Sequence, residues 1–163
     1  MLTVRRLAAG DHAAVRRIVC ALPDHFTSDV PDRVERDAAD HEGWVLADSA
    51  EVAGPAEVAG FAVVARRSPG GAEILWMAVD PARRGHGLGT LLLEQMLGEL
   101  AADGVSVIEV KTLDRSADYQ PYEATRAFWE RRGFVYVDTI DPLPGWEPGN
   151  PAAIYVAALR PTR

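Results

Sequence analysis

The sequence lacks the residues that would build a disulfide framework, a metal centre or a membrane span. Its only cysteine, Cys20, cannot form an internal disulfide or share a metal with a second thiol. The histidines His12, His25, His41 and His86 have no metal-ligand spacing, so we predict no metal. No apolar run approaches the roughly 20 residues of a membrane helix, and the N-terminus lacks the apolar stretch of a signal peptide. These absences predict a cytoplasmic protein with no membrane partner.

Basic residues are also fewer than acidic residues. Lys and Arg number 17 against 24 Asp and Glu, which gives a formal net charge of -7. A surface of this sign repels phosphate backbones, and no local basic cluster reverses it, so nucleic acid is not an expected partner. The hydrophobic fraction of 48% and the charged fraction of 25% are ordinary for a globular protein. A chain of 163 residues has room for one core, so we predict a single domain over residues 1–163.

Hydrophobic periodicity and turn residues predict about seven strands and four helices. The predicted strands are Thr3–Leu7, Trp44–Ala47, Gly60–Arg67, Ala72–Val79, Ser106–Thr112, Phe134–Thr139 and Ala153–Leu159. The predicted helices run from the N-cap Asp11 to Leu22, from Pro31 to Glu42, from Gly87 to Ala102 and from Tyr122 to Arg132. The order β-α-α-β-β-β-α-β-α-β-β predicts an α/β protein with a mixed central sheet flanked by helices.

Three details of this assignment make specific predictions. Cys20 stands among apolar residues of the first helix, so we expect it to pack in the core. The helix that follows Gly87 is expected to bury one apolar face, formed by Leu88, Leu91, Leu92, Met96 and Leu100. Residues 50–55 (AEVAGP) are nearly repeated by residues 56–61 (AEVAGF), which we interpret as a duplication in a surface loop whose second copy enters a strand.

The sharpest signal is the segment Val79–Thr90, VDPARRGHGLGT, between a predicted strand and a predicted helix. Gly85, Gly87 and Gly89 lack Cβ atoms, so the phosphate oxygens of a ligand can approach the backbone closely. The free N–H groups at a helix start and the helix dipole favour an anion there. Thr90 stands where a dinucleotide-binding motif has its last glycine, and no Gly-Lys-Ser/Thr follows, so neither common nucleotide motif applies.

At this point the sequence resembles the GNAT superfamily of N-acetyltransferases. Residues 84–89, RGHGLG, match its Arg/Gln-x-x-Gly-x-Gly/Ala signature, which binds the coenzyme A pyrophosphate. Residues 128–134, FWERRGF, match the family pattern Leu-Tyr-Glu-Lys-x-Gly-Phe at the end of a late helix. The order of elements agrees with that of the family over nearly the whole chain. The resemblance implies the GNAT-like acyl-CoA N-acyltransferase fold and acetyl-CoA as the cofactor.

The resemblance also implies how the cofactor lies. The strands Ala72–Val79 and Ser106–Thr112 would splay apart and hold the pantetheine arm between them, and the N–H of Met77 would polarise the thioester carbonyl. The implied cofactor-binding residues are Met77, Ala78, Val79, Arg84, Gly85, His86, Gly87, Leu88, Gly89, Thr90, Phe128 and Trp129.

Two positions are predicted to move protons. Glu73, in an Ala-Glu-Ile run similar to that of the histone-acetyltransferase branch, is the candidate general base; the alternative is a solvated residue at a strand start. Trp129 stands where many members have a tyrosine that protonates the leaving thiolate, and an indole cannot do this. Tyr122 is our first substitute, and Tyr119 or solvent is the alternative.

In the fold that the resemblance implies, the loop between the first two helices and the connection between the last two strands flank a cleft for the acceptor. These loops carry His25, Phe26, Trp146 and Glu147, and an aromatic loop residue such as Trp146 can enclose an amine. Arg126 is expected to form a surface ion pair.

Taken together, the sequence predicts an acetyl-CoA-dependent N-acetyltransferase that acetylates a primary amine by direct attack while both substrates are bound. A small-molecule amine is the expected acceptor partner, and dimers are frequent among relatives, which leaves a homodimer open. One alternative is a non-catalytic acyl-CoA sensor, because the usual tyrosine is missing. The other is an enzyme that acetylates a protein N-terminus or lysine.

Overall fold

The computed structural model describes residues 1–48 and 57–160, which form one seven-stranded sheet and four α-helices. The strands are β1 (Leu2–Arg6), β2 (Glu42–Asp48), β3 (Val58–Ser68), β4 (Gly71–Val79), β5 (Val107–Leu113), β6 (Val135–Ile140) and β7 (Ala152–Ala158). The helices are α1 (His12–Cys20), α2 (Val30–Asp40), α3 (Leu88–Ala102) and α4 (Glu123–Arg131). The predicted α/β class and element order are confirmed.

The strand order in the sheet is β1-β2-β3-β4-β5-β7-β6. Only β4 and β5 pair in parallel, and α3 makes the crossover between them; every other neighbouring pair is antiparallel. The second copy of the near-repeat enters β3 at Val58, as predicted. The whole first copy, residues 50–55, falls within residues 49–56, outside the described residues, so its predicted place in a surface loop is not tested.

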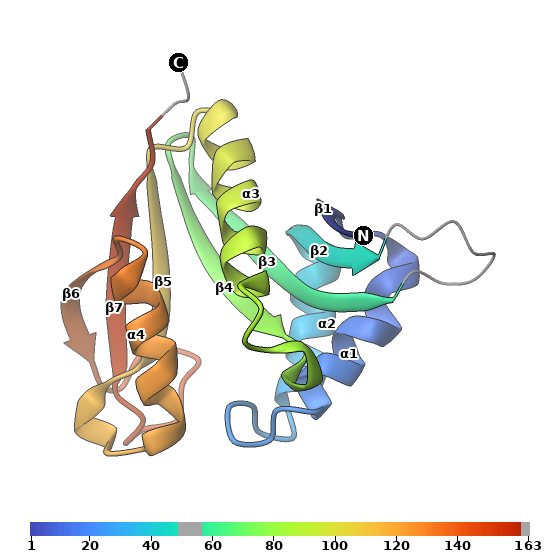
Figure 1. The fold of residues 1–163 in the computed structure, drawn as a ribbon. Helices are drawn as coiled ribbons and strands as arrows, with labels where there is room; N and C mark the ends of the chain where they lie inside the picture. The colour runs from blue at the N-terminus through green and yellow to red at the C-terminus, as the bar shows by residue number, and fades with distance from the viewer. Residues whose placement is uncertain (49–56, 161–163) are drawn as a thin grey trace.

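Helices cover both faces of the sheet (Figure 1). Helices α3 and α4 pack on one face, where Leu92, Met96 and Trp129 join the apolar side chains of β3, β4, β5 and β7. Helices α1 and α2 pack on the other face, where Ile18 and Val34 meet side chains of β2 and β3. Because both faces of the sheet are covered there, β2 and most of β3 are buried at successive residues rather than at every second residue. Among the described residues, no helix is long and apolar enough to span a membrane.

The structure corrects one residue of the predicted α3 face. Leu92, Met96 and Leu100 are fully buried, but Leu91 is 42% exposed and Leu93 takes its place in the core. Residues 92, 96 and 100 lie along one stripe at four-residue spacing, and Leu93 borders that stripe on the side that faces the sheet. Because α3 is apolar on nearly all sides, its sequence could not show which neighbour of the stripe turns inward.

Two further predictions about burial were wrong. Cys20 is exposed, because the buried stripe of α1 passes through Val15, Ile18 and Val19 and leaves residue 20 on the outer side. Arg126 is buried rather than in a surface ion pair, and its Nη1 donates a hydrogen bond to the carbonyl of Leu113 at 2.9 Å. That bond ties α4 to the end of β5.

Candidate active site

The parallel strands β4 and β5 separate halfway along β4. Their pairing runs from Gly71 opposite Val107 to Ile74 opposite Val110 and then stops, although β4 continues to Val79. The separation coincides with a bulge, because Leu75 has no register partner on β3 between Ile74 and Trp76. A bulge bends and twists the strand that carries it. Figure 1 shows the two strands side by side at one end and diverging toward the other.

The separation leaves the β5-facing edge of Trp76–Val79 without a strand partner among the described residues. The predicted splay is therefore present, and the backbone groups of Met77 and its neighbours on that edge are free to bind an extended chain. The bulge itself has no signal in the sequence.

The turn after β4, residues 80–90, has the backbone that its glycines predict. Gly85 and Gly87 have φ values of 84° and 70°, in the left-handed region, and Gly87 is the N-cap of α3. A Cβ built on either residue would meet no atom of the protein within 4 Å. The space over these two glycines is open, which fits a ligand that approaches the backbone closely.

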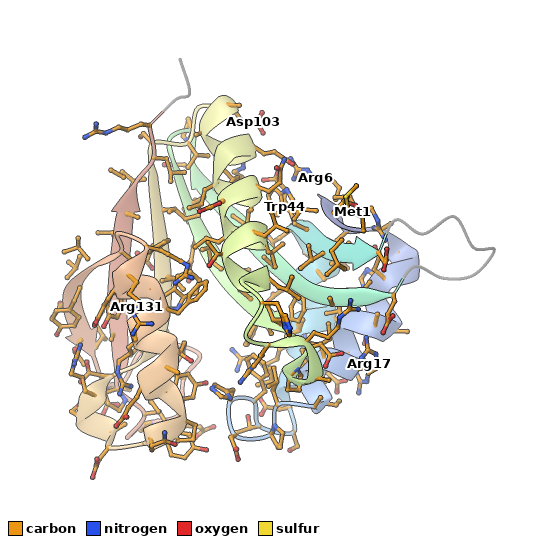
Figure 2. All side chains as sticks on the ribbon, viewed as in Figure 1. Met1, Arg6, Arg17, Trp44, Asp103 and Arg131 are labelled. Carbon is orange, nitrogen blue, oxygen red and sulfur yellow. The ribbon has the colours of Figure 1, made fainter. Side chains whose placement is uncertain are left out.

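The start of this glycine turn is held by an ion pair that sequence reasoning did not single out. The Asp80 carboxylate accepts hydrogen bonds from Arg17 Nη1 at 2.7 Å and from the Ala82 amide at 3.0 Å. The bond from Arg17 lowers the pKa of Asp80 more than burial raises it. Arg17 lies on α1 beside the loop that follows β4 (Figure 2). The contact fixes where β4 ends and the turn begins.

Helix α4 holds the other end of the turn. A Cβ on Gly89 would lie 3.2 Å from Cε2 of Phe128, so the glycine permits close packing of α3 against α4. Arg132 stacks on the Phe128 ring with its Cζ 3.8 Å from the ring centroid, and its Nε donates to Thr90 Oγ1 at 3.0 Å. The two sequence landmarks predicted for the cofactor are thus in direct contact.

A cavity of about 890 Å³ lies where β4 and β5 diverge. Its walls come from the α1–α2 loop, α2, β4, β5, the start of α4 and the β6–β7 connection. Among the predicted site residues, those that line it are His25, Phe26, Glu73, Met77, Ala78, Arg84, Tyr122, Trp129, Trp146 and Glu147. Segments far apart in the sequence therefore meet at one cavity, and the glycine turn lies beside it.

Glu73 is buried at 8% exposure, so it is not the solvated strand-start residue of our alternative interpretation. Its Oε2 accepts hydrogen bonds from Arg67 Nε at 2.8 Å and from Arg67 Nη2 at 2.7 Å. Its Oε1 accepts one from Lys111 Nζ at 2.7 Å. Both carboxylate oxygens are therefore in charge-assisted hydrogen bonds with cations.

Lys111 remains a charged partner in this cluster. Burial alone would lower its pKa, but hydrogen bonds with Glu109 and Glu73 outweigh that effect and raise the pKa. Neither Arg67 nor Lys111 was singled out in the sequence. Lys111 lies within an otherwise alternating strand, and nothing in its local sequence relates it to Glu73.

The α1–α2 loop is tied to the segment before α4 by reciprocal hydrogen bonds. Tyr122 Oη donates to the carbonyl of His25 at 2.6 Å, and Tyr119 Oη donates to that of Asp24 at 2.8 Å. In return, His25 Nε2 lies 3.0 Å from the carbonyl oxygen of Pro121. Burial raises the pKa of Tyr122 to about 12. A phenol of this pKa is a weak acid toward a thiolate whose own pKa is about 8.5.

Trp129 is buried between Phe128 and Phe134, with ring centroids 5.0 Å from each. Its indole N–H has no acceptor among the described residues. Thr112 on β5 also lines the cavity, and its buried Oγ1 has no hydrogen-bond partner among the described residues. A buried hydroxyl without a partner is uncommon, so Thr112 is a site residue that sequence reasoning missed.

A model of the acetyltransferase (GNAT) domain matches residues 39–136, which is more than half of the chain. This chain belongs to the GNAT family of acetyltransferases. Its class of activity is therefore N-acetyl transfer, and the family uses acetyl-CoA as the donor. The match covers the glycine turn and the end of α4. Among curated protein sequences no match is found.

Solved structures of GNAT proteins share the fold along the full chain. A protein assigned to the GNAT family of acetyltransferases from Desulfovibrio desulfuricans is 22% identical, with a TM-score of 0.82 and coverage of 98% of this chain and 99% of that one. The ribosomal-protein-S18-alanine N-acetyltransferase of Escherichia coli is 20% identical, with a TM-score of 0.74 and coverage of 100% and 97%. A GNAT acetyltransferase from Elizabethkingia anophelis, solved with acetyl-CoA bound, is 16% identical, with a TM-score of 0.69 and coverage of 97% and 98%. At these identities the likeness supports the fold and leaves the acceptor undetermined.

Proposed function

We propose that this GNAT enzyme transfers the acetyl group of acetyl-CoA to a primary amine of a small molecule, with both substrates bound together. The observation that carries the proposal is the cavity at the divergence of β4 and β5, which adjoins the glycine turn on one side and is bridged by loops on the other. The acceptor nitrogen attacks the acetyl carbonyl directly, so that a C–N bond forms as the C–S bond breaks.

Several features of the site fit coenzyme A. The left-handed backbone at Gly85 and Gly87 leaves open space over the amides that open α3, where a pyrophosphate would bind. The unpaired edge of Met77–Val79 offers backbone groups to the pantetheine arm, and the Thr112 hydroxyl has no hydrogen-bond partner within residues 1–48 and 57–160. We assign Arg84–Thr90, with Phe128 and Trp129 behind them, to the same cofactor. When bound, the cofactor supplies the activated acetyl group.

The acceptor side supports a small molecule over a protein segment, because the cavity is bridged at two places. The α1–α2 loop is bonded to the segment Tyr119–Tyr122. Arg33 of α2 reaches the β6–β7 connection, with its Nη2 3.5 Å from the carbonyl oxygen of Gly145. An extended peptide needs an open groove, whereas bridges of this kind suit an acceptor that fits inside a pocket.

Aromatic side chains line this part of the cavity. Phe26 meets Trp76 edge to face at 6.1 Å, and the Arg33 guanidinium lies over Trp76 with its Cζ 5.5 Å from the ring centroid. The Trp76 indole N–H donates to Asp37 at 2.6 Å. These surfaces, with Trp146 on the β6–β7 connection, are where we expect the acceptor's carbon skeleton to pack.

Release of free CoA from acetyl-CoA, measured against a panel of amines, tests the proposal. We expect turnover with at least one small primary amine and no saturable turnover with peptides that end in a free α-amine or carry lysine. Saturable acetylation of such peptides alone would support the protein-acetylating alternative. If calorimetry shows tight binding of CoA but no thiol is released above background, the result would support the alternative of a non-catalytic acyl-CoA sensor.

The single domain over residues 1–163, the cytoplasmic location and the homodimer also stay predictions, as do the roles of the individual site residues.

A further inference from the structure

The proposed reaction requires a group that takes a proton from the acceptor nitrogen. The predicted group, Glu73, accepts two hydrogen bonds from Arg67 and one from Lys111, so its carboxylate charge is paired with two cations. A base needs a free lone pair that is close to the cavity and is not already neutralised by cations. Another titratable side chain that lines the cavity meets this requirement better.

His25 carries such a lone pair. The oxygen of Pro121 can only accept a hydrogen bond, so the 3.0 Å contact requires that His25 Nε2 carries the proton. In the neutral ring the other nitrogen, Nδ1, is then the acceptor. Nδ1 has no hydrogen-bond partner among the described residues, and His25 lines the cavity.

The position of His25 is set from both sides of the divergence. Its ring lies 5.0 Å from the Tyr122 ring at the start of α4, and its carbonyl accepts the Tyr122 hydroxyl. The next residue, Phe26, packs on Trp76, which directly precedes Met77 in β4. The imidazole is thus held across the opening between β4 and α4, on the side where the acceptor is proposed to bind.

Resting on the function proposed above, we propose that Nδ1 of His25 accepts the proton of the acceptor amine. As the C–N bond forms and the C–S bond breaks, the amine proton moves to Nδ1, directly or through one water. The imidazolium then passes it to the departing sulfur or to solvent, which restores the neutral ring. Glu73 is left with a structural role that holds Arg67 and Lys111 in place.

The charges around His25 favour the neutral ring. Burial is the largest effect and lowers the pKa of His25; the hydrogen bond with Pro121 acts in the opposite direction. Arg84, in the glycine turn, also lowers this pKa, and Asp24, in the same loop, raises it. The facing group from the segment before α4 is the phenol of Tyr122, whose pKa burial raises to about 12, and the Tyr119 ring packs beside that phenol. The ring is therefore ready to accept a proton at neutral pH.

The decisive variant is His25→Gln, because the glutamine amide nitrogen can take the place of Nε2 and keep the hydrogen bond to Pro121 while it cannot accept a proton. We expect kcat to fall by about 100-fold or more. We also expect the Kd for CoA, measured by calorimetry, to stay within about threefold of the wild-type value. The profile of kcat/KM against pH should lose its acid limb, which in the wild type should lie below the ordinary histidine pKa of about 6.5.

Two further measurements separate catalysis from folding. His25→Ala should recover activity when imidazole is added, whereas a loop that has merely lost its anchor would not respond. Glu73→Gln, assayed in parallel, should keep the acid limb. A His25→Gln enzyme with wild-type turnover and an unchanged acid limb would overturn the assignment of His25 alone. A wild-type enzyme that binds CoA but acetylates no amine would overturn the proposed function together with it.

Discussion

The glycine turn and the acceptor side of the cavity are built in different ways. The turn is one contiguous segment that presents its backbone, and its geometry comes from glycines at residues 85, 87 and 89. The acceptor side is assembled from the α1–α2 loop, α2, β4, β5 and the β6–β7 connection, and it presents side chains. A site formed by the backbone of one segment can be predicted from a short sequence motif. A site formed by side chains of distant segments can be recognised only in the folded structure.

The two regions also differ in where their ion pairs lie. The anchor of the turn, Arg17 with Asp80, lies at its edge and leaves the amides that open α3 free. In the cavity the buried carboxylate of Glu73 is paired with Arg67 and Lys111. The turn therefore leaves its amides available to an anion, whereas binding of the acceptor in the cavity must rely on shape, aromatic surface and groups other than Glu73.

The largest effect on cofactor binding is expected from a substitution that fills the open space over the glycine turn. Gly87→Val places a β-branched side chain at a φ of 70°, which costs about 1–2 kcal/mol, and sets it where the pyrophosphate is proposed to bind. We expect calorimetry to show a loss of CoA affinity of about 100-fold or more. Gly98→Ala in the exposed middle of α3 is the control, and it should leave CoA binding unchanged while raising stability by about 0.5–1 kcal/mol. Normal CoA binding by Gly87→Val would remove the turn from the cofactor site.

An intermediate effect is expected from Glu73→Gln, which leaves Arg67 and Lys111 without their shared carboxylate. Because Arg67 is more than half exposed, we expect denaturant unfolding to show a loss of only about 1–2 kcal/mol. Turnover should fall by about tenfold or less with His25 as the base. Glu109→Gln is the matched control, because Glu109 pairs with the same lysine but does not line the cavity. A fall of about 100-fold with loss of the acid limb would instead restore Glu73 as the base.

A smaller effect is expected from Tyr122→Phe. It removes one hydrogen bond to the α1–α2 loop, worth about 1 kcal/mol, and we expect kcat to fall by less than tenfold. The folded-state pKa of Tyr122 is raised to about 12 from an ordinary value of about 10. Its contribution to stability is therefore complete below pH 10 and is lost as the pH rises through 12. Unfolding measured over this range should show the loss in the wild type and not in the variant.

Tyr119→Phe is the matched control, since it removes the neighbouring bond to Asp24 from a more exposed ring. If Tyr122→Phe alone lost about 100-fold in kcat, the predicted role of Tyr122 as general acid would be supported.

The smallest effect should come from Cys20→Ser. The thiol is exposed on α1, so we expect stability to change by less than about 0.5 kcal/mol and turnover to stay at the wild-type level. A thiol reagent should label the wild-type protein without inhibiting it. Loss of thiol release in the variant would indicate an acyl-cysteine route and would contradict direct transfer.

Much of the fold could be predicted because local patterns and tertiary packing agree. The strands and helices were placed within a few residues of their observed bounds, and Gly133 ends the last helical segment with a φ of 83°, as its position after α4 predicts. The errors fall where the local pattern is ambiguous. Leu91 stands in a helix that is apolar on nearly all sides, so only packing could decide its burial, whereas Cys20 follows directly after the buried stripe of α1 and its apolar neighbours concealed its outward position.

The sequence by itself determined the order of the elements and the cofactor turn, because periodicity and glycine conformation are local properties of a few adjacent residues. It also placed Glu73, His25 and Trp146 among the candidates for the cavity. Only the tertiary structure decided the contacts of Glu73 and His25: it joined Glu73 to Lys111 across the paired ends of β4 and β5, and it left Nδ1 of His25 without a hydrogen-bond partner in the part of the chain that the structure describes. Those contacts depend on a bulge at Leu75 and on a loop bridge of more than 90 residues in sequence separation, and neither has a local signature.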